Sequence, residues 1–95
     1  MKLSELVQGV SNASVRGDPA TEITGLAYHT RDVTDGTLFF CVPGLSFDGH
    51  AFAAAAVEAG AAALVCERDT GVGAPQVVVP SVRRAMALAA ARWYG

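Results

Sequence analysis

The stretch that decides the fold runs from Thr37 to Gly60 and reads TLFFCVPGLSFDGHAFAAAAVEAG. Its continuous apolar run over 38–42 predicts a β-strand, and the alanine-rich segment at its end predicts an α-helix. The segment between them, 43–50, contains proline and glycine and predicts a loop. In α/β proteins, ligands bind at such a junction, because the strand ends in a crevice and the next helix presents unpaired N–H groups. We therefore expect the function of the chain to lie in this loop.

The glycine spacing of the loop is similar to that of an ATP-binding phosphate loop, but the groups that bind phosphate are missing. Gly44 and Gly49 are separated by four residues, yet His50 and Ala51 stand where a lysine and a serine or threonine are needed. Without them the loop has neither a fixed charge for the outer phosphates nor a magnesium ligand. The sequence argues against an ATP site here. The alternative is a tight turn in which Asp48 caps the following helix.

The composition describes one small domain without signs of nucleic-acid or membrane binding. The chain has 95 residues, of which 52% are apolar and 17% charged, and its net charge is −2. Seven basic residues are scattered among nine acids, so no basic patch is available for nucleic acid. We expect no signal peptide, because Glu5 precedes any apolar run, and no membrane span, because no apolar run reaches the roughly 18 residues that a span requires.

The two cysteines predict a reducing compartment. Cys41 and Cys66 each lie in an apolar run, far apart and without a third metal ligand nearby. Such residues are expected to be buried free thiols, in a cytoplasmic protein without a metal site.

Helical and strand-like segments alternate along the chain, with no internal repeat. Apolar spacing and turn residues predict helices over 4–10, 51–59 and from Ser81 onward, and strands over 22–28, 37–42, 63–67 and 76–79. Gly60 supplies the left-handed residue that commonly ends a helix, and Ser81 caps the last helix. The strands on either side of the 51–59 helix are expected to be parallel. The predicted fold class is α/β, with a small mixed or parallel sheet flanked by helices.

A second candidate site follows the first of the longer strands, in the segment Tyr28-His29-Thr30-Arg31. If this strand and the apolar strand are neighbours, the loops after them share one rim, which also includes Ser46 and Phe47. Such a rim suits a sugar nucleotide, with an apolar surface for the base, hydroxyls for ribose or phosphate oxygens and a fixed cation for the diphosphate. The alternative is a solvated loop in which Arg31 and Asp32 form a surface ion pair.

Several short motifs occur in a recognisable order along the whole chain: Met1-Lys2-Leu3-Ser4-Glu5-Leu6, Gly25 to Arg31, Asp35 to Gly44, Asp48-Gly49-His50, Gly60-Ala61-Ala62 and Arg83 to Tyr94. In this order the chain resembles the N-terminal domain of the Mur ligases. It is most similar to the branch that adds the third residue of the peptidoglycan stem peptide, the MurE branch.

The resemblance implies that this domain holds the uridine diphosphate end of the substrate, UDP-MurNAc-L-Ala-D-Glu. The substrate-binding positions that it implies in this sequence are Tyr28, Thr30, Arg31, Leu45, Ser46 and Phe47. The family usually reads Asp-Ser-Arg where this chain has His29-Thr30-Arg31. Thr30 keeps the hydroxyl of that motif, whereas His29 replaces an anion that would orient Arg31.

The resemblance further implies that residues 1–95 are one domain of a larger cytoplasmic ligase of cell-wall synthesis. Such a ligase uses ATP and Mg²⁺ to activate a carboxylate as an acyl phosphate, which an amine then attacks. This chemistry would lie in a central ATPase domain and a C-terminal domain, and the latter would choose lysine, diaminopimelate or another amino acid. We therefore expect no catalytic residue, no metal and no cofactor within these residues.

Two alternative functions remain from the sequence. One is the same domain of the ligase that adds the terminal dipeptide to this precursor, the MurF branch, which also carries Asp-Gly-His. The other is an interaction module without a nucleotide site, in which exposed Phe47 and Trp93 contact a partner. Saturable binding of UDP is expected of both ligase domains and not of the interaction module.

Overall fold

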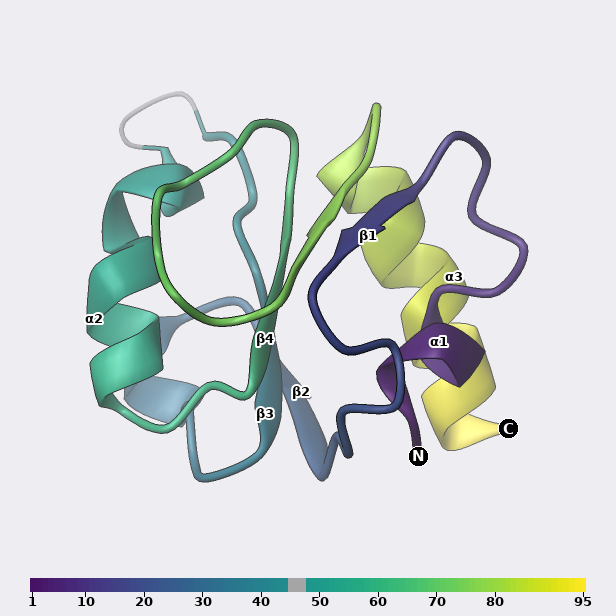
Figure 1. Cartoon of the computed structure of the whole chain (residues 1–95), viewed down its shortest axis with the longest axis horizontal. Coiled ribbons are helices and arrows are strands. Elements are labelled where there is room, and N and C mark those ends of the chain that lie inside the picture. The colour runs from purple at the N-terminus through teal and green to yellow at the C-terminus, as the bar shows by residue number, and fades with distance from the viewer. Residues whose placement is uncertain (45–47) are drawn as a thin grey trace.

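The computed structural model describes residues 1–44 and 48–95, and its strands form one sheet (Figure 1). The strands are β1 (Ser14–Arg16), β2 (Gly25–Ala27), β3 (Thr37–Phe40), β4 (Ala63–Cys66) and β5 (Gln76–Val78). Their spatial order is β1-β5-β4-β3-β2. All neighbouring pairs from β2 to β5 are parallel, and β1 pairs antiparallel with β5 at one edge. The sheet is therefore mixed.

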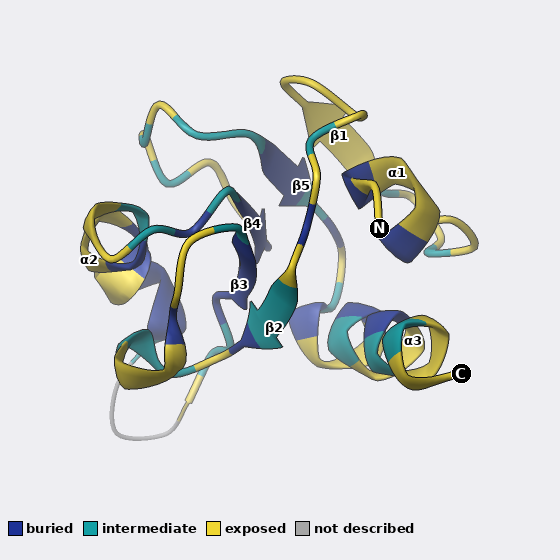
Figure 2. Ribbon diagram, turned by 90° about the horizontal axis from the view of Figure 1, so that it is seen from below, coloured by how far each residue is buried: buried dark blue, intermediate teal, exposed yellow. Residues whose placement is uncertain are grey.

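Helices cover both faces of this sheet. The helix α2 (Ala53–Glu58) lies on one face, whereas α1 (Leu3–Leu6) and α3 (Val82–Tyr94) lie on the other (Figure 1, Figure 2). The structure also has two short 3-10 turns. The turn η1 (Thr30–Asp32) follows β2, and the turn η2 (Gly49–Phe52) directly precedes α2. This arrangement confirms the predicted α/β class. No helix in the described part of the chain is long and apolar enough to cross a membrane.

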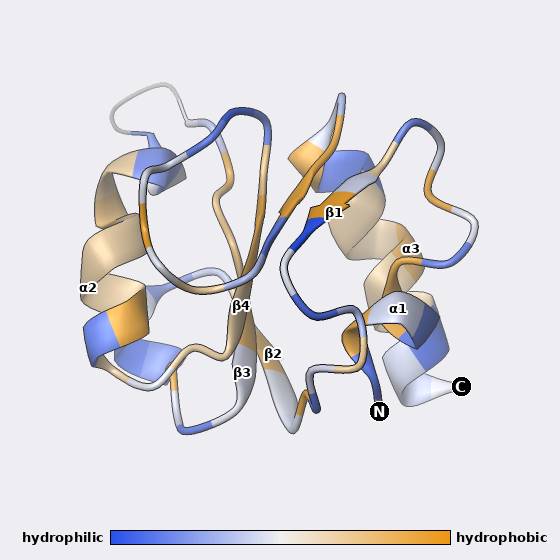
Figure 3. Ribbon diagram, in the orientation of Figure 1, coloured by the Kyte–Doolittle hydropathy of each residue, from blue (hydrophilic) through white to orange (hydrophobic). Residues whose placement is uncertain are grey.

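The strand β3 lies inside the sheet and is buried on both faces (Figure 2). Leu38 and Phe40 pack in the core cluster shared with α1 and α3, while Phe39 and Cys41 pack in the cluster shared with α2. A strand covered on both faces must be apolar at successive positions, which explains its continuous apolar run. Figure 3 shows the complement of this pattern, with polar residues mainly in the loops.

Several helix bounds differ from those predicted. The first helix ends at Leu6, with Val7 as its C-cap, and it cannot reach Val10 because Gly9 adopts a φ of 89° that a helix does not allow. The helix after the loop begins as the 3-10 turn η2, so α2 itself starts only at Ala53. At its other end Gly60 has a φ of 118°, which confirms the positive-φ residue expected there.

The strands are shorter than predicted, and β1 was not predicted at all. All three residues of β1 are exposed, and the segment Ser-Val-Arg is too short for its sequence pattern to indicate a strand. Its conformation comes from pairing with β5, in which Val15 lies opposite Val77. The parallel pairing of β3 with β4, which was predicted, is confirmed.

Both cysteines are free and buried, as the apolar runs around them predicted. Burial raises the pKa of the Cys41 thiol to about 12, and it also raises the pKa of the Cys66 thiol. Both side chains therefore stay protonated near neutral pH.

We predict that Cys41 and Cys66 react slowly with thiol reagents in the native protein, because only the exposed thiolate is a good nucleophile. Labelling followed by mass spectrometry should show little modification in native buffer and complete modification in denaturant. Fast native labelling of either thiol would contradict its burial in the core.

Candidate functional site

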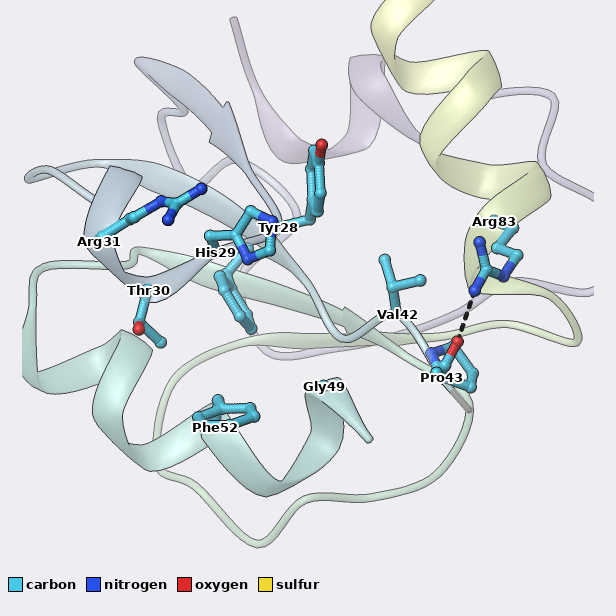
Figure 4. A pocket seen from close by; sticks show the side chains of 11 residues that line it. Tyr28, His29, Thr30, Arg31, Val42, Pro43, Gly49, Phe52 and Arg83 are labelled. Carbon is cyan, nitrogen blue, oxygen red and sulfur yellow. Dashed lines mark hydrogen bonds between the residues drawn. The ribbon is translucent and has the colours of Figure 1, made fainter. Parts of the chain in front are cut away.

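The ends of two neighbouring strands form the candidate site. Because β2 and β3 are adjacent and parallel, the segments that follow them meet at one edge of the sheet. They enclose a pocket of about 590 Å³ (Figure 4). It is lined by Tyr28, His29, Thr30, Arg31, Phe39, Val42, Pro43, Gly44, Gly49, Phe52 and Arg83. The two strands are thus neighbours, as the predicted rim required, while Ser46 and Phe47 of that rim lie outside the described residues.

Three of the six predicted substrate-binding residues line this pocket. Tyr28 follows β2 directly, and Thr30 and Arg31 belong to the turn η1. The other three, Leu45, Ser46 and Phe47, lie outside the described residues. Within the part of the chain that is described, the structure brings the expected tyrosine, hydroxyl and guanidinium together on one side of the pocket (Figure 4).

His29, which stands where the resemblance implied an aspartate, packs against its neighbour in the chain. It precedes η1 in an extended conformation, with a φ of −120° and a ψ of 139°. Its ring lies 4.6 Å from that of Tyr28, at an interplanar angle of 42°. The imidazole therefore supports the Tyr28 ring, which is 56% exposed and presents an aromatic surface at the pocket.

Some lining residues were missed by the sequence reasoning, and Arg83 and Phe52 are the clearest examples. Phe52 ends η2 and is the only aromatic residue within the alanine-rich segment, which was the signal available in the sequence. Arg83 lies in the first turn of α3, and its Nη2 donates a hydrogen bond of 2.7 Å to the carbonyl oxygen of Pro43. Its signal was a positive charge at a helix N-terminus, where the helix dipole disfavours a cation.

The Asp-Gly-His motif is a structural feature beside the pocket. Asp48 Oδ1 accepts a hydrogen bond from the backbone N–H of His50 at 3.0 Å, which confirms the helix cap predicted for Asp48. The buried His50 ring joins two segments, because its Nδ1 lies 2.6 Å from Asp48 Oδ1 and its Nε2 accepts from the Glu67 N–H at 2.8 Å. Since Nε2 is an acceptor, Nδ1 carries the proton and donates to the carboxylate.

The same network continues to the end of β4 and the start of α3. Arg68 Nη2 donates to Asp48 Oδ2 at 2.8 Å, so both oxygens of that carboxylate are paired. Glu67 Oε2 accepts from the Val82 N–H at 2.9 Å, and Ser81 Oγ accepts from the Arg84 N–H at 3.2 Å. These two acceptors cap α3 and confirm the role predicted for Ser81.

Position 49 requires glycine because the backbone of Val42 packs directly against it. A Cβ atom at this position would lie 2.6 Å from the Val42 nitrogen and 2.8 Å from the Val42 oxygen. The Gly49 N–H donates to that same oxygen at 2.9 Å. The motif therefore needs a residue without a side chain where the chain returns past the end of β3.

The described residues do not form the site that ATP and a metal would need. Among them, no group of three His, Cys, Asp or Glu side chains could hold a metal ion. Lys2 is the single lysine of the chain, and it lies at the start of α1 rather than among the residues that line the pocket. An ATP cradle with a phosphate-binding lysine therefore does not fit this pocket.

The fold and the pocket define an α/β domain whose candidate site lies at the carboxyl ends of parallel strands. Residues 22–94 match the Mur ligase family, catalytic domain. The chain therefore belongs to the Mur ligase family.

Named relatives and solved structures agree with this assignment. The chain is 47% identical over 95 residues to a UDP-N-acetylmuramoyl-L-alanyl-D-glutamate--2,6-diaminopimelate ligase of Geobacillus thermodenitrificans, and 45% identical over 97 residues to that of Syntrophomonas wolfei. These matches cover 100% of this chain but only 19% and 20% of the relatives, so the chain spans about a fifth of their length.

The structural neighbours come from the same family. A crystal structure of MurF from Acinetobacter baumannii superimposes with a TM-score of 0.77 at 28% sequence identity. The superimposed region covers 95% of the present chain and 19% of the MurF chain. This similarity confirms the predicted resemblance to the Mur ligases and the fold that it implied.

We predict that Gly49→Ala destabilises the protein by about 1–3 kcal/mol, because the new methyl group overlaps the backbone of Val42. The matched control is Gly73→Ala, since a Cβ at Gly73 would meet no atom within 4 Å. Urea denaturation of the two variants should separate them clearly. Equal stability would contradict the steric requirement at Gly49.

A second prediction concerns the charge of Asp48. The N–H groups of His50 and the Arg68 guanidinium hold the pKa of this carboxyl well below its usual range. A lowered pKa contributes stability that is complete above the unfolded value of about 4 and is lost as the pH falls below it. Thermal melts should therefore show that wild type is more stable than Asp48→Asn at neutral pH, and that the gap narrows below about pH 4. A gap independent of pH would contradict the ionised network.

Proposed function

We propose that this chain is the substrate-binding domain of a peptidoglycan ligase and that its pocket holds the uridine diphosphate part of UDP-MurNAc-L-Ala-D-Glu. The observation that carries the proposal is the pocket itself, in which the loops after β2 and β3 meet. Its volume of about 590 Å³ lies within the range of roughly 300–1,000 Å³ usual for small-molecule sites.

The chemistry of the lining suits a nucleoside diphosphate. The exposed ring of Tyr28 offers a flat surface for a base, and Thr30 offers a hydroxyl for ribose or phosphate oxygens. Arg31 and Arg83 supply two permanent cations, and no carboxylate occurs among the described residues that line the pocket. This balance favours an anionic ligand. Leu45, Ser46 and Phe47, which belong to the same proposed site, lie outside the described residues.

The whole ligase would add the third amino acid of the stem peptide. The relatives named above are ligases for 2,6-diaminopimelate, and their sequence identity to this chain exceeds that of the MurF structures. ATP and Mg²⁺ would supply the acyl-phosphate chemistry in domains beyond these 95 residues, in the cytoplasm. The role of this domain is to bind and orient the nucleotide end of the substrate.

Titration with UDP tests the proposal. We expect saturable binding with a dissociation constant on the order of 0.1–1 mM. The affinity should be weak because the ligand's contacts in an open site offset only part of the entropy that is lost on association. Backbone NMR shifts should cluster at residues 28–31 and 44–49 and leave the 70–75 loop unchanged. If UDP well above that concentration moves none of these resonances, the assigned site is wrong and an interaction module becomes the better reading.

The hydroxyl of Thr30 provides a sharper test of the same site. We predict that Thr30→Ala weakens UDP binding about three- to tenfold, which corresponds to the roughly 1 kcal/mol of one hydrogen bond. Thr30→Ser keeps the donor and acceptor and should bind nearly as wild type does. Equal affinity of all three proteins would exclude a hydroxyl contact.

A further inference from the structure

We propose that Arg83 is a positioning residue that holds the Pro43–Gly44 segment in the shape required to bind the nucleotide. The inference rests on the function proposed above and adds to it a residue outside the segments expected to bind substrate. Arg83 belongs to α3, whereas the other described residues of the pocket come from β2, β3, η1, η2 and their loops. It is therefore the pocket's only contribution from that helix, among the residues described.

The first observation is a direct contact with the loop. Arg83 Nη2 donates to the Pro43 carbonyl oxygen at 2.7 Å, across forty residues of sequence. Figure 4 shows Arg83 beside Pro43 at one end of the pocket and Arg31 at the other. A hydrogen bond from a charged donor is stronger than one between neutral groups. The contact fixes the backbone where the chain leaves the sheet.

The second observation is that this contact closes a ring of interactions around the base of the loop. Pro43 forms an isolated antiparallel β-bridge with Asp48, and the Asp48 carboxylate is hydrogen-bonded to His50. The ring continues from the His50 imidazole to the Glu67 N–H, and from the Glu67 carboxylate to the Val82 N–H. Val82 directly precedes Arg83, and the hydrogen bond from Arg83 to the Pro43 carbonyl oxygen completes the ring. Without Arg83 the ring is open at the residues that line the pocket.

The third observation is the cost of placing the arginine there. The first turn of α3 contains no acidic residue, and a cation in this turn is disfavoured by the helix dipole. Arg84 in the same turn lines a different pocket, together with Ser11 and Asn12. Arg83 and Arg84 thus have the same charge and the same helix turn but different surroundings, which makes Arg84 the matched control.

The test compares Arg83→Met, Arg83→Lys and Arg84→Met in the 95-residue chain. Arg83→Met keeps the aliphatic stem and removes every donor, and we expect it to weaken the binding of uridine, which has no phosphate, about three- to tenfold. The binding of UDP should weaken by at least as much, because UDP also loses the attraction of the Arg83 charge. Arg83→Lys keeps a positively charged donor group without the planar guanidinium and should restore part of the affinity. Arg84→Met should bind as wild type does. Melting temperatures measured alongside identify any variant that is not folded.

The free protein gives a second readout that does not depend on a ligand. In Arg83→Met the backbone amide resonance of Gly44, whose peptide group includes the Pro43 carbonyl, should shift, whereas in Arg84→Met it should not. An unchanged Gly44 amide, or unchanged affinity for both ligands, would overturn the positioning role. Loss of UDP affinity alone would also overturn it, because Arg83 would then contact the phosphates directly. If wild type binds no UDP, the proposed function itself fails, which separates the two outcomes.

Discussion

The arrangement of the candidate site depends on one buried imidazole. His50 donates from Nδ1 to Asp48 and accepts at Nε2 from the backbone of Glu67, so it joins the loop after β3 to the end of β4. Both ring nitrogens are paired, which a buried imidazole requires if its burial is not to be costly. Because the Glu67 carboxylate then caps α3, this contact also fixes where the helix begins relative to the pocket.

The same network determines the electrostatic character of the pocket. Asp48 belongs to the loop that we expected to bind a diphosphate, and a free negative charge there would repel an anionic ligand. In the structure both carboxylate oxygens are occupied, one by His50 and the other by Arg68, and Asp48 is not among the residues lining the pocket. The charges that remain on the pocket wall are Arg31 and Arg83, which attract an anion.

The sequence predicted what local patterns encode and missed what long-range contacts create. The apolar run of β3, the cap at Ser81 and the positive φ of Gly60 follow from local residue chemistry, and all three are confirmed. By contrast, the exposed strand β1 exists through its pairing with β5, and Arg83 reaches the pocket only because α3 starts beside the loop. Contacts between residues forty positions apart leave no periodic signal in a single sequence.

The most recognisable motif of the chain and the residues of the candidate pocket are under different physical constraints. Asp-Gly-His is fixed by a backbone contact that excludes any Cβ and by hydrogen bonds that only these side chains complete, so substitution affects the fold directly. At His29 the structure shows a looser contact, in which the ring packs against an exposed tyrosine. The motif therefore belongs to the scaffold of the fold, and this scaffold holds in place the rim at which we propose that the ligand binds.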